Sequence, residues 1–298
     1  MRVIAFLLWL LVSFSLSAQQ PKVIVIGFDG LSGWALSRVE TPALDMLKQN
    51  GVFTLKAKAV RPTDSAPNWA SMIMGASPKQ HQITSNGWKE HILKRKIFCN
   101  RPKGKLFPTI FDVLREQRSH LDIYVVHHWK EFAKLTDEKV LDALIHEKTE
   151  QNTLAKAIEL IKSKQPDLLF LHFDHCDHAG HAYGHDSPQY FEAVKAADSI
   201  VAEIIKATQT AGIFKDTYFL VTSDHGGIKK GHGGNHPREI EIPWILSGPK
   251  TAKNVALPDH SVQQYDTAPT IAHIFGIKTP PCWIGQPPAQ AFISSSSE

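Results

Sequence analysis

Three short apolar runs, each followed directly by an aspartate, constrain the fold of this chain more than any other feature. The runs cover residues 23–28, 168–173 and 218–223. None of them shows the polar alternation of a half-exposed strand, so we expect strands that are buried on both faces of a mostly parallel sheet. Residues 123–126 and 242–246 are two further candidate strands.

Helical patterns lie between these runs, at residues 41–49, 109–118, 154–164, 187–210 and 267–275. Strands that alternate with helices indicate an α/β layered domain. The composition agrees, because 43% of the 298 residues are hydrophobic and 21% are charged. These values are ordinary for a globular protein, and they exclude a collagen-like, coiled-coil or disordered chain.

The first 18 residues have the layout of a secretory signal peptide. Arg2 is followed by an apolar run over 3–12 and a Ser-rich stretch, with cleavage expected after Ser17 or Ala18. We therefore predict an exported protein, periplasmic or extracellular, with one metal-dependent hydrolase domain over 19–298. An uncleaved N-terminal anchor is the alternative. No other stretch is long and apolar enough to span a membrane.

The net charge and the cysteines limit which binding partners and which kinds of metal site we expect. A formal net charge of +4 is mild and does not call for a nucleic acid or an acidic membrane. Three cysteines, at 99, 176 and 282, cannot form a four-cysteine zinc site. In an oxidising compartment Cys99 and Cys282 could form a disulfide, and free thiols are the alternative.

Histidines and aspartates gather after the predicted strands. Ligands of such sheets bind at the carboxyl ends of the strands. Zinc accepts both carboxylate and imidazole ligands, and two zinc ions with three protein ligands each would use six residues. Ordinary turn aspartates and surface histidines are the alternative. The six candidate ligands are Asp29, Asp177, His181, Asp224, His225 and His232.

Ser65 is a candidate nucleophile. It stands just before a helix predicted over 67–74, with Pro67 near the helix start and Gly75 at its end. The positive end of a helix dipole favours phosphate at this position. An ordinary capping serine is the alternative.

The chain resembles the alkaline phosphatase superfamily, and most closely its nucleotide pyrophosphatase/phosphodiesterase (type I phosphodiesterase) branch. Residues 61–86, RPTDSAPNWASMIMGASPKQHQITSN, are similar to the nucleophile segment of that branch. The shared pattern is Pro-Thr-x-Thr/Ser-x-Pro-Asn, followed without a gap by Gly75, Pro78, His81, Ile83 and Asn86. GFDG at 27–30, DHAGHAYG at 177–184, SDHGG at 223–227 and HGG at 232–234 follow in the order of the family.

The resemblance implies a three-layer sandwich and a role for each site residue. One zinc would be held by Asp29, Asp224 and His225, and it would also activate Ser65. The second zinc would be held by Asp177, His181 and His232, with His236 as the alternative to His232. Asn68 would donate a hydrogen bond to a phosphate oxygen. The implied reaction is hydrolysis of a small phosphate ester, such as a nucleotide, through a phosphoseryl intermediate.

Three departures from the branch bear on the substrate. Ser65 replaces the usual threonine, Trp69 stands where the branch often has histidine, and the long insertions of larger members are missing. A phosphomonoesterase is therefore an alternative, and it would need a cationic clamp. The candidates for that clamp are Arg61, Lys89, Lys94, Arg95, Lys96, Arg101 and Lys103.

Two other functions are weaker alternatives. A sulfatase needs arginine at the end of a C/S-x-P-x-R segment, and Trp69 occupies that position here. A non-enzymatic exported metal-binding protein would need the histidines and aspartates, but not Ser65 and Asn68. Zinc cannot be distinguished from other divalent metals by these ligands, and the sequence does not set the oligomeric state.

Overall fold

The computed structural model describes residues 20–89 and 106–293. The predicted signal peptide and Cys99 lie outside these ranges. Cys176 is free and buried, whereas Cys282 takes part in a disulfide. Within the described ranges, no helix combines the length and the apolar character that crossing a bilayer requires.

A single eight-stranded sheet forms the middle layer, in the order β4-β3-β5-β1-β6-β7-β2-β8. Parallel pairs join β4, β3, β5, β1 and β6, whereas β7 is antiparallel to both β6 and β2. The prediction of a mostly parallel sheet is therefore confirmed. The strands are β1 (Lys22–Phe28), β2 (Gly51–Lys58), β3 (Ile123–His127), β4 (Ala143–His146), β5 (Leu168–Phe173), β6 (Thr217–Ser223), β7 (Glu241–Ser247) and β8 (Val255–Ala256).

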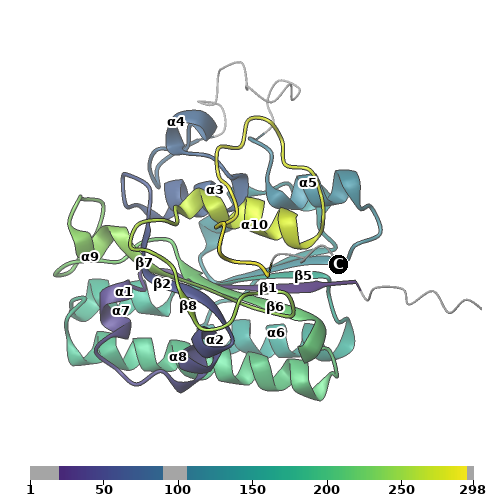
Figure 1. Cartoon of the computed structure of the whole chain (residues 1–298). Helices are drawn as coiled ribbons and strands as arrows, with labels where there is room; N and C mark the ends of the chain where they lie inside the picture. The colour runs from purple at the N-terminus through teal and green to yellow at the C-terminus, as the bar shows by residue number, and fades with distance from the viewer. Residues whose placement is uncertain (1–19, 90–105, 294–298) are drawn as a thin grey trace, which may run out of the picture.

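Helices cover both faces of this sheet, which makes the predicted three layers (Figure 1). α3, α5 and α10 pack on one face, and α2, α6 and α8 pack on the other. The helices are α1 (Gly33–Leu36), α2 (Pro42–Gln49), α3 (Ser65–Met74), α4 (Pro78–His81), α5 (Ile110–Gln117), α6 (Glu150–Ser163), α7 (His175–Tyr183), α8 (Pro188–Thr210), α9 (Pro237–Ile240) and α10 (Thr267–Ile274).

The central strand β1 shows why the apolar runs are continuous. Val23 and Val25 belong to the core on the α3 side, whereas Ile24 and Ile26 belong to the core on the α8 side. Alternate side chains of a strand point to opposite faces, and here both faces are buried. Each fully buried aliphatic side chain contributes roughly 1.5–3 kcal/mol, so these runs fix the position of β1 in the sheet.

The structure corrects several predicted boundaries. α3 begins at Ser65 instead of residue 67, so Ser65 is the first helical residue and not the residue before the helix. α6 begins at Glu150 because the Thr149 side chain accepts a hydrogen bond from the Asn152 backbone N–H. The sequence analysis did not predict α7, β2, β4 or β8.

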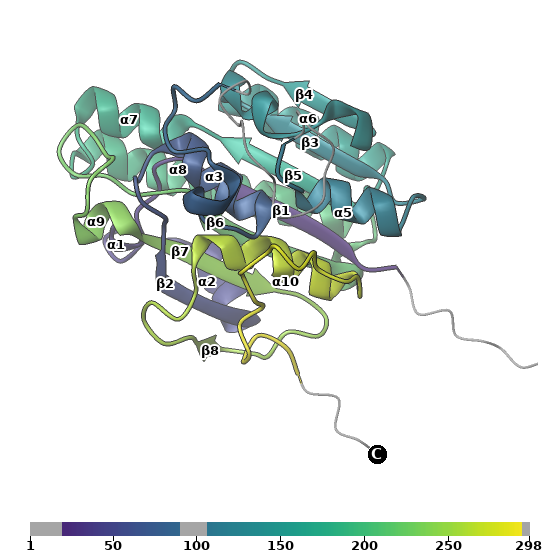
Figure 2. The same ribbon diagram turned by 90° about the horizontal axis from the view of Figure 1, so that it is seen from above.

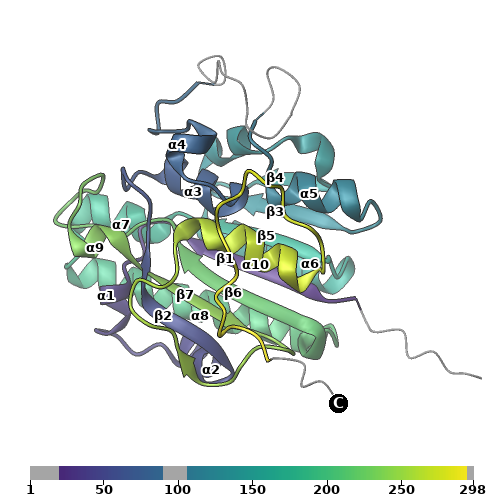
Figure 3. The same cartoon turned by 45° about the horizontal axis from the view of Figure 1, so that its top comes forward.

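The carboxyl ends of β5, β1 and β6 meet at one edge of the sheet. Phe28 is in register with Phe173 on one side and with Ser223 on the other. The aspartates that follow these strands therefore leave the sheet side by side. Figures 2 and 3 show α7 and α9 together at one end of the molecule, with α3 beside them.

Candidate active site

Backbone contacts hold Asp29 at the end of β1 and tie it to α7. The backbone N–H of Asp29 donates to Phe173 O, and the carbonyl of Asp29 accepts from the Asp177 N–H at 3.0 Å. Gly30, with φ at +71°, makes this contact close, because a Cβ there would lie 2.6 Å from the Cα of Asp177. Asp29 and the start of α7 are thus fixed as neighbours.

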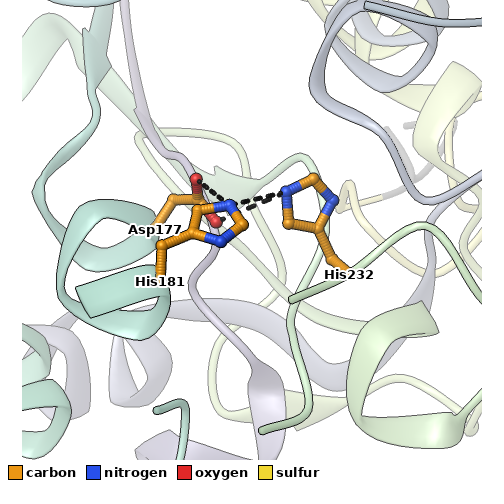
Figure 4. A group of neighbouring side chains, drawn as sticks. All are labelled: Asp177, His181 and His232. Atoms are coloured by element: carbon orange, nitrogen blue, oxygen red, sulfur yellow. Dashed lines mark hydrogen bonds and ion pairs between the residues drawn. The ribbon is translucent and has the colours of Figure 1, made fainter. Parts of the chain in front are cut away.

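The first group of candidate ligands consists of Asp177, His181 and His232 (Figure 4). Asp177 and His181 share one face of α7 because they are four residues apart, and His181 Nε2 lies 3.2 Å from Asp177 Oδ2. His232 comes from the loop before α9. Its Nε2 is 3.1 Å from His181 Nε2 and 3.7 Å from Asp177 Oδ1.

The second group gathers around His225 at the end of β6. His225 Nε2 lies 3.4 Å from Asp29 Oδ1, 3.3 Å from Asp224 Oδ2 and 3.3 Å from Ser65 Oγ. Ser65 is 5% exposed, and the other three are almost completely buried. The two groups are adjacent, since ligand atoms of Asp29, Asp177 and His225 all lie within 4.8 Å of one another.

All three histidines present the same ring nitrogen to the site. Their Nδ1 atoms lie 2.8–2.9 Å from backbone carbonyls: His225 from Gly226 O, His181 from Lys230 O and His232 from Thr63 O. A carbonyl can only accept, so each Nδ1 carries a proton, and Nε2 is the ring nitrogen that faces the site. This is the ring orientation of metal-bound histidine.

The carboxylates of the site have buried oxygens that a cation would stabilise. Asp29 Oδ1, Asp177 Oδ1 and Asp224 Oδ2 are buried and have no hydrogen-bond partner within the described part of the chain. Burial, followed by repulsion from neighbouring carboxylates, holds the pKa of Asp29 and of Asp224 well above its usual range. A cation at this point would satisfy the free oxygens and relieve the repulsion.

Asp177 and two of the histidines also have shifted pKa values. Burial alone would raise the pKa of Asp177, but the hydrogen bond with His181 and the charges of His225 and His232 lower it to about 2. The same hydrogen bond raises the pKa of His181 to about 9. Burial and the His232 charge lower the pKa of His225 to about 3, which favours the neutral imidazole that binds metals. The residues therefore fit divalent cations, in either group.

His232, and not His236, faces this site. His236 is the N-cap residue of α9, where its Nδ1 accepts a hydrogen bond from the Arg238 N–H. Its ring is therefore engaged in capping a short helix. The two alternatives left open by the sequence are separated by this geometry in favour of His232.

Asn68 does not lie where the predicted phosphate contact requires. It is completely buried. Its side-chain Nδ2 donates to the carbonyls of Val60, Pro62 and Asp64, and its Oδ1 accepts from the Val60 N–H. We therefore correct its expected role, because its polar atoms hold the loop that leads to Ser65.

Asn86 is a site residue that the sequence analysis did not single out. Its Oδ1 accepts a hydrogen bond from the Ala66 N–H at 2.8 Å, beside Ser65. Asn86 is exposed, and its Nδ2 has no acceptor within the described residues. A signal was present, because Asn86 closes the segment that resembles the nucleophile region of the family.

A cationic clamp for a phosphomonoester is not seen in the described ranges. Of the seven candidates, Arg61 and Lys89 are described and the other five lie in 94–103, outside those ranges. Neither Arg61 nor Lys89 forms a hydrogen bond or an ion pair with a predicted site residue. No other described lysine or arginine side chain hydrogen-bonds to or pairs with the eight predicted site residues.

Comparisons with known sequences identify the family of the chain. The family model of type I phosphodiesterase / nucleotide pyrophosphatase matches residues 23–232. GPI ethanolamine phosphate transferase 1 of Candida glabrata is 26% identical over 284 residues, covering 86% of this chain and 30% of the relative. Human ectonucleotide pyrophosphatase/phosphodiesterase family member 5 is 24% identical over 243 residues, covering 72% and 46%. The chain thus spans less than half the length of either relative.

Solved structures share the fold. Murine ectonucleotide pyrophosphatase/phosphodiesterase 5, in an inactive form in complex with AMP, superposes with a TM-score of 0.72 at 18% identity, covering 88% of this chain and 96% of that one. A 2-O GAG sulfatase also gives 0.72 at 15% identity, covering 90% and 73%. The fold is therefore alkaline-phosphatase-like, as predicted. Since the family model matches most of the chain, the protein belongs to the type I phosphodiesterase/nucleotide pyrophosphatase family.

Proposed function

We propose that this protein is a phosphoric ester hydrolase that acts on phosphodiesters or nucleotide pyrophosphates. The observation that carries the proposal is the convergence of six metal-ligating side chains beside the Ser65 hydroxyl, at the carboxyl edge of the sheet. Membership of the family supports it, and so does the AMP complex of the murine protein.

Two zinc ions suit the two groups of ligands. Asp29, Asp224 and His225, together with Ser65, would hold one ion. Asp177, His181 and His232 would hold the other. Bound zinc lowers the pKa of a hydroxyl that it contacts and neutralises charge on phosphoryl oxygens. Sites with three protein ligands keep positions open for a substrate.

Ser65 would act as the nucleophile. Its Oγ attacks phosphorus in line with the leaving oxygen, so that an Oγ–P bond forms while the bond to the leaving alcohol breaks. That alcohol leaves with the proton that Ser65 gives up. The resulting phosphoseryl group keeps the second alcohol of a diester. Water then attacks the same phosphorus and returns the hydroxyl of Ser65.

Asn86 would hold the phosphoryl group beside Ser65. Its amide orientation is fixed by the hydrogen bond from the Ala66 N–H, which leaves both Nδ2 hydrogens free to donate. A donor fixed in advance beside developing negative charge stabilises the transition state without reorganising. This is the role that the sequence analysis gave to Asn68.

A phosphotransferase is the second candidate, favoured by the fungal GPI ethanolamine phosphate transferases. It could use the same attack by Ser65, with an alcohol in place of water in the second step. A phosphomonoesterase is a further alternative, and five of the seven candidates for its cationic clamp lie outside the described ranges. Against a sulfatase, Trp69 stands where that chemistry needs arginine, and the structural likeness to a sulfatase concerns the fold alone.

Export of the mature domain over 19–298 remains part of the proposal. It predicts that the mature protein recovered from the periplasm or the medium begins after Ser17 or Ala18. N-terminal sequencing of that material would test it. A chain that keeps residues 1–18 and fractionates with the membrane would indicate the uncleaved anchor instead.

The function is tested by an activity panel with the zinc-loaded full chain. The substrates are bis(p-nitrophenyl) phosphate, a phenylphosphonate ester, p-nitrophenyl phosphate and a dinucleotide pyrophosphate. We expect the highest kcat/KM on a diester or a pyrophosphate. An acceptor alcohol in the same assay separates transfer from hydrolysis, because transfer yields a new diester. Preference for p-nitrophenyl phosphate would favour the phosphomonoesterase.

A further inference from the structure

Trp69 contacts the candidate metal ligand Asp29 directly. The indole Nε1–H of Trp69 donates a hydrogen bond of 2.9 Å to Asp29 Oδ2. Trp69 is completely buried and Asp29 is 1% exposed. The two oxygens of this carboxylate therefore differ in their hydrogen bonding. Oδ2 has a donor from the protein, whereas Oδ1 faces His225 Nε2 at 3.4 Å and has no hydrogen-bond partner in the described chain.

Gly27 makes room for the indole ring. A Cβ at position 27 would lie 2.5 Å from Cη2 and 2.6 Å from Cζ3 of Trp69. Gly27 and Asp29 are two residues apart, at the end of β1, so the ring can lie over the glycine while its N–H reaches the carboxylate. A larger residue at 27 would displace the ring, and with it the hydrogen bond.

His172 lies beside the same oxygen on the neighbouring strand, without a hydrogen bond to it. It is in register with Gly27 across the β1–β5 pair, and its ring centroid lies 4.6 Å from that of Trp69. The Trp129 N–H points at His172 Nδ1 from 3.5 Å, which leaves the proton on Nε2. That Nε2 lies 3.4 Å from Asp29 Oδ2.

We propose that Trp69 is a positioning residue, which reserves Asp29 Oδ2 for the protein and leaves Oδ1 for the metal held with Asp224 and His225. This inference rests on the metal site of the proposed function. It also gives a physical meaning to one departure from the family, the tryptophan at a position where the branch often has histidine. Trp69 is completely buried, so it would act through Asp29 and not on the substrate directly.

The size of the effect follows from what orienting groups do in metal sites. A ligating carboxylate that loses its fixed hydrogen bond can rotate, and loss of such an orienting partner typically weakens metal binding or activity roughly 10- to 100-fold. Only one of the two sites should respond. The Asp177, His181 and His232 group has no contact with the indole N–H.

The test is Trp69→Phe in the full chain, which removes the N–H and keeps an aromatic ring. Trp244→Phe is the matched control, because Trp244 is equally buried and its indole N–H donates to Thr267 Oγ1 at 3.2 Å, away from the ligands. Zinc binding is measured by chelator competition, and cobalt-loaded protein is compared by visible absorption. Both readouts are independent of turnover.

We expect Trp69→Phe to bind one metal normally and the other roughly 10- to 100-fold more weakly. Its cobalt spectrum should change at one site, while Trp244→Phe matches the wild type in both readouts. Gly27→Ala, which keeps the N–H but crowds the ring, should give the same selective loss as Trp69→Phe.

Two outcomes would overturn the inference. The first is wild-type affinity for both metals in Trp69→Phe. The second is an equal loss at both sites together with a drop in melting temperature no different from that of Trp244→Phe, because this pattern marks a purely structural role. If the protein binds metal normally but hydrolyses no ester, the proposed function fails and the role of Trp69 is still measured.

Discussion

The Nδ1 atom of His232 lies 2.8 Å from the backbone carbonyl oxygen of Thr63, which joins the loop of this candidate ligand to the segment that carries Ser65. The Thr63 hydroxyl strengthens this junction, since it donates to Gly234 O and accepts from the Gly233 N–H. Thr63 is completely buried. One residue thus fixes the position of a ligand and the approach to the nucleophile.

We expect Thr63→Val to loosen this junction without changing any ligand. The substitution removes the hydroxyl and leaves the Gly233 N–H without its acceptor, which costs about 1–3 kcal/mol of unfolding free energy. Zinc affinity at the His232 site should fall roughly 10-fold. Thr217→Val is the control, because the hydroxyl of Thr217 is also buried and bonds only to Ile213 O, at the far end of β6. Equal zinc affinity in both variants would refute this coupling.

Two asparagines should respond in opposite ways to truncation. Asn86→Ala removes the proposed phosphate donor, and loss of such a donor typically lowers kcat about 100- to 1000-fold. The melting temperature should fall less than in Asn68→Ala, because the Asn86 side chain is exposed and its loss removes one acceptor, that of the Ala66 N–H. Asn68→Ala removes buried hydrogen bonds to the loop before Ser65, so it should chiefly lower the melting temperature. Steady-state kinetics and thermal unfolding of both variants decide between them. A reversed pattern would restore the role first expected of Asn68.

Removal of the metals should change the effect of one substitution from harmful to favourable. Burial and nearby carboxylates hold the pKa of Asp224 well above its usual range, so its ionised form is unfavourable when no cation is bound. After chelation at pH 8, Asp224→Asn should therefore melt at a higher temperature than the wild type. With zinc bound the order should reverse, because the variant has lost a ligand. The same order under both conditions would argue against a cation at this carboxylate.

The acid stability of the protein should depend on His81. Burial lowers its pKa to about 3. Its Nδ1 accepts from the Ile83 N–H, and its Nε2 bonds to Ser71 Oγ. In the unfolded chain the His81 side chain takes up a proton near pH 6.5, whereas in the folded chain it stays neutral until the pH approaches 3. The contribution to stability is thus full above pH 6.5 and is lost as the pH falls towards 3.

His81→Gln should remove this pH dependence. Between pH 7.5 and 4.5, the wild type should lose about 3 kcal/mol of unfolding free energy that the variant keeps. Urea unfolding across this range measures the difference. The exposed His120 offers the control, since His120→Gln should follow the wild-type slope. Parallel curves for the wild type and His81→Gln would contradict the buried, neutral state of His81.

The parts of the fold that the sequence predicted are those with a continuous or periodic apolar signal. β1, β5 and β6 are buried on both faces, so their runs are unmistakable. β2 was missed because Lys56 and Lys58 interrupt its apolar pattern. α7 was missed because its nine residues, HCDHAGHAY, include candidate ligands and small residues and form no apolar stripe.

Some features of the candidate site could likewise be predicted from the sequence, and others could not. The candidate ligands named from the sequence lie together in the structure, because the segments that carry them follow the neighbouring strands β1, β5 and β6. The indole of Trp69 reaching Asp29, 40 residues away, depends on the packing of α3 against β1 and has no local signal. Likewise, the separate environments of Asn68 and Asn86 follow from how the 60–64 loop folds around the start of α3.

Ser65 is the residue on which the proposed hydrolysis depends most. The most direct test is hydrolysis of the preferred diester by zinc-loaded wild type and Ser65→Ala, with acid quenching and mass spectrometry of the peptide that contains residue 65. We predict a phosphoryl adduct on Ser65 in the wild type and a loss of at least about 1000-fold in kcat in the variant. Near wild-type turnover by Ser65→Ala, with no adduct on the wild type, would contradict the account.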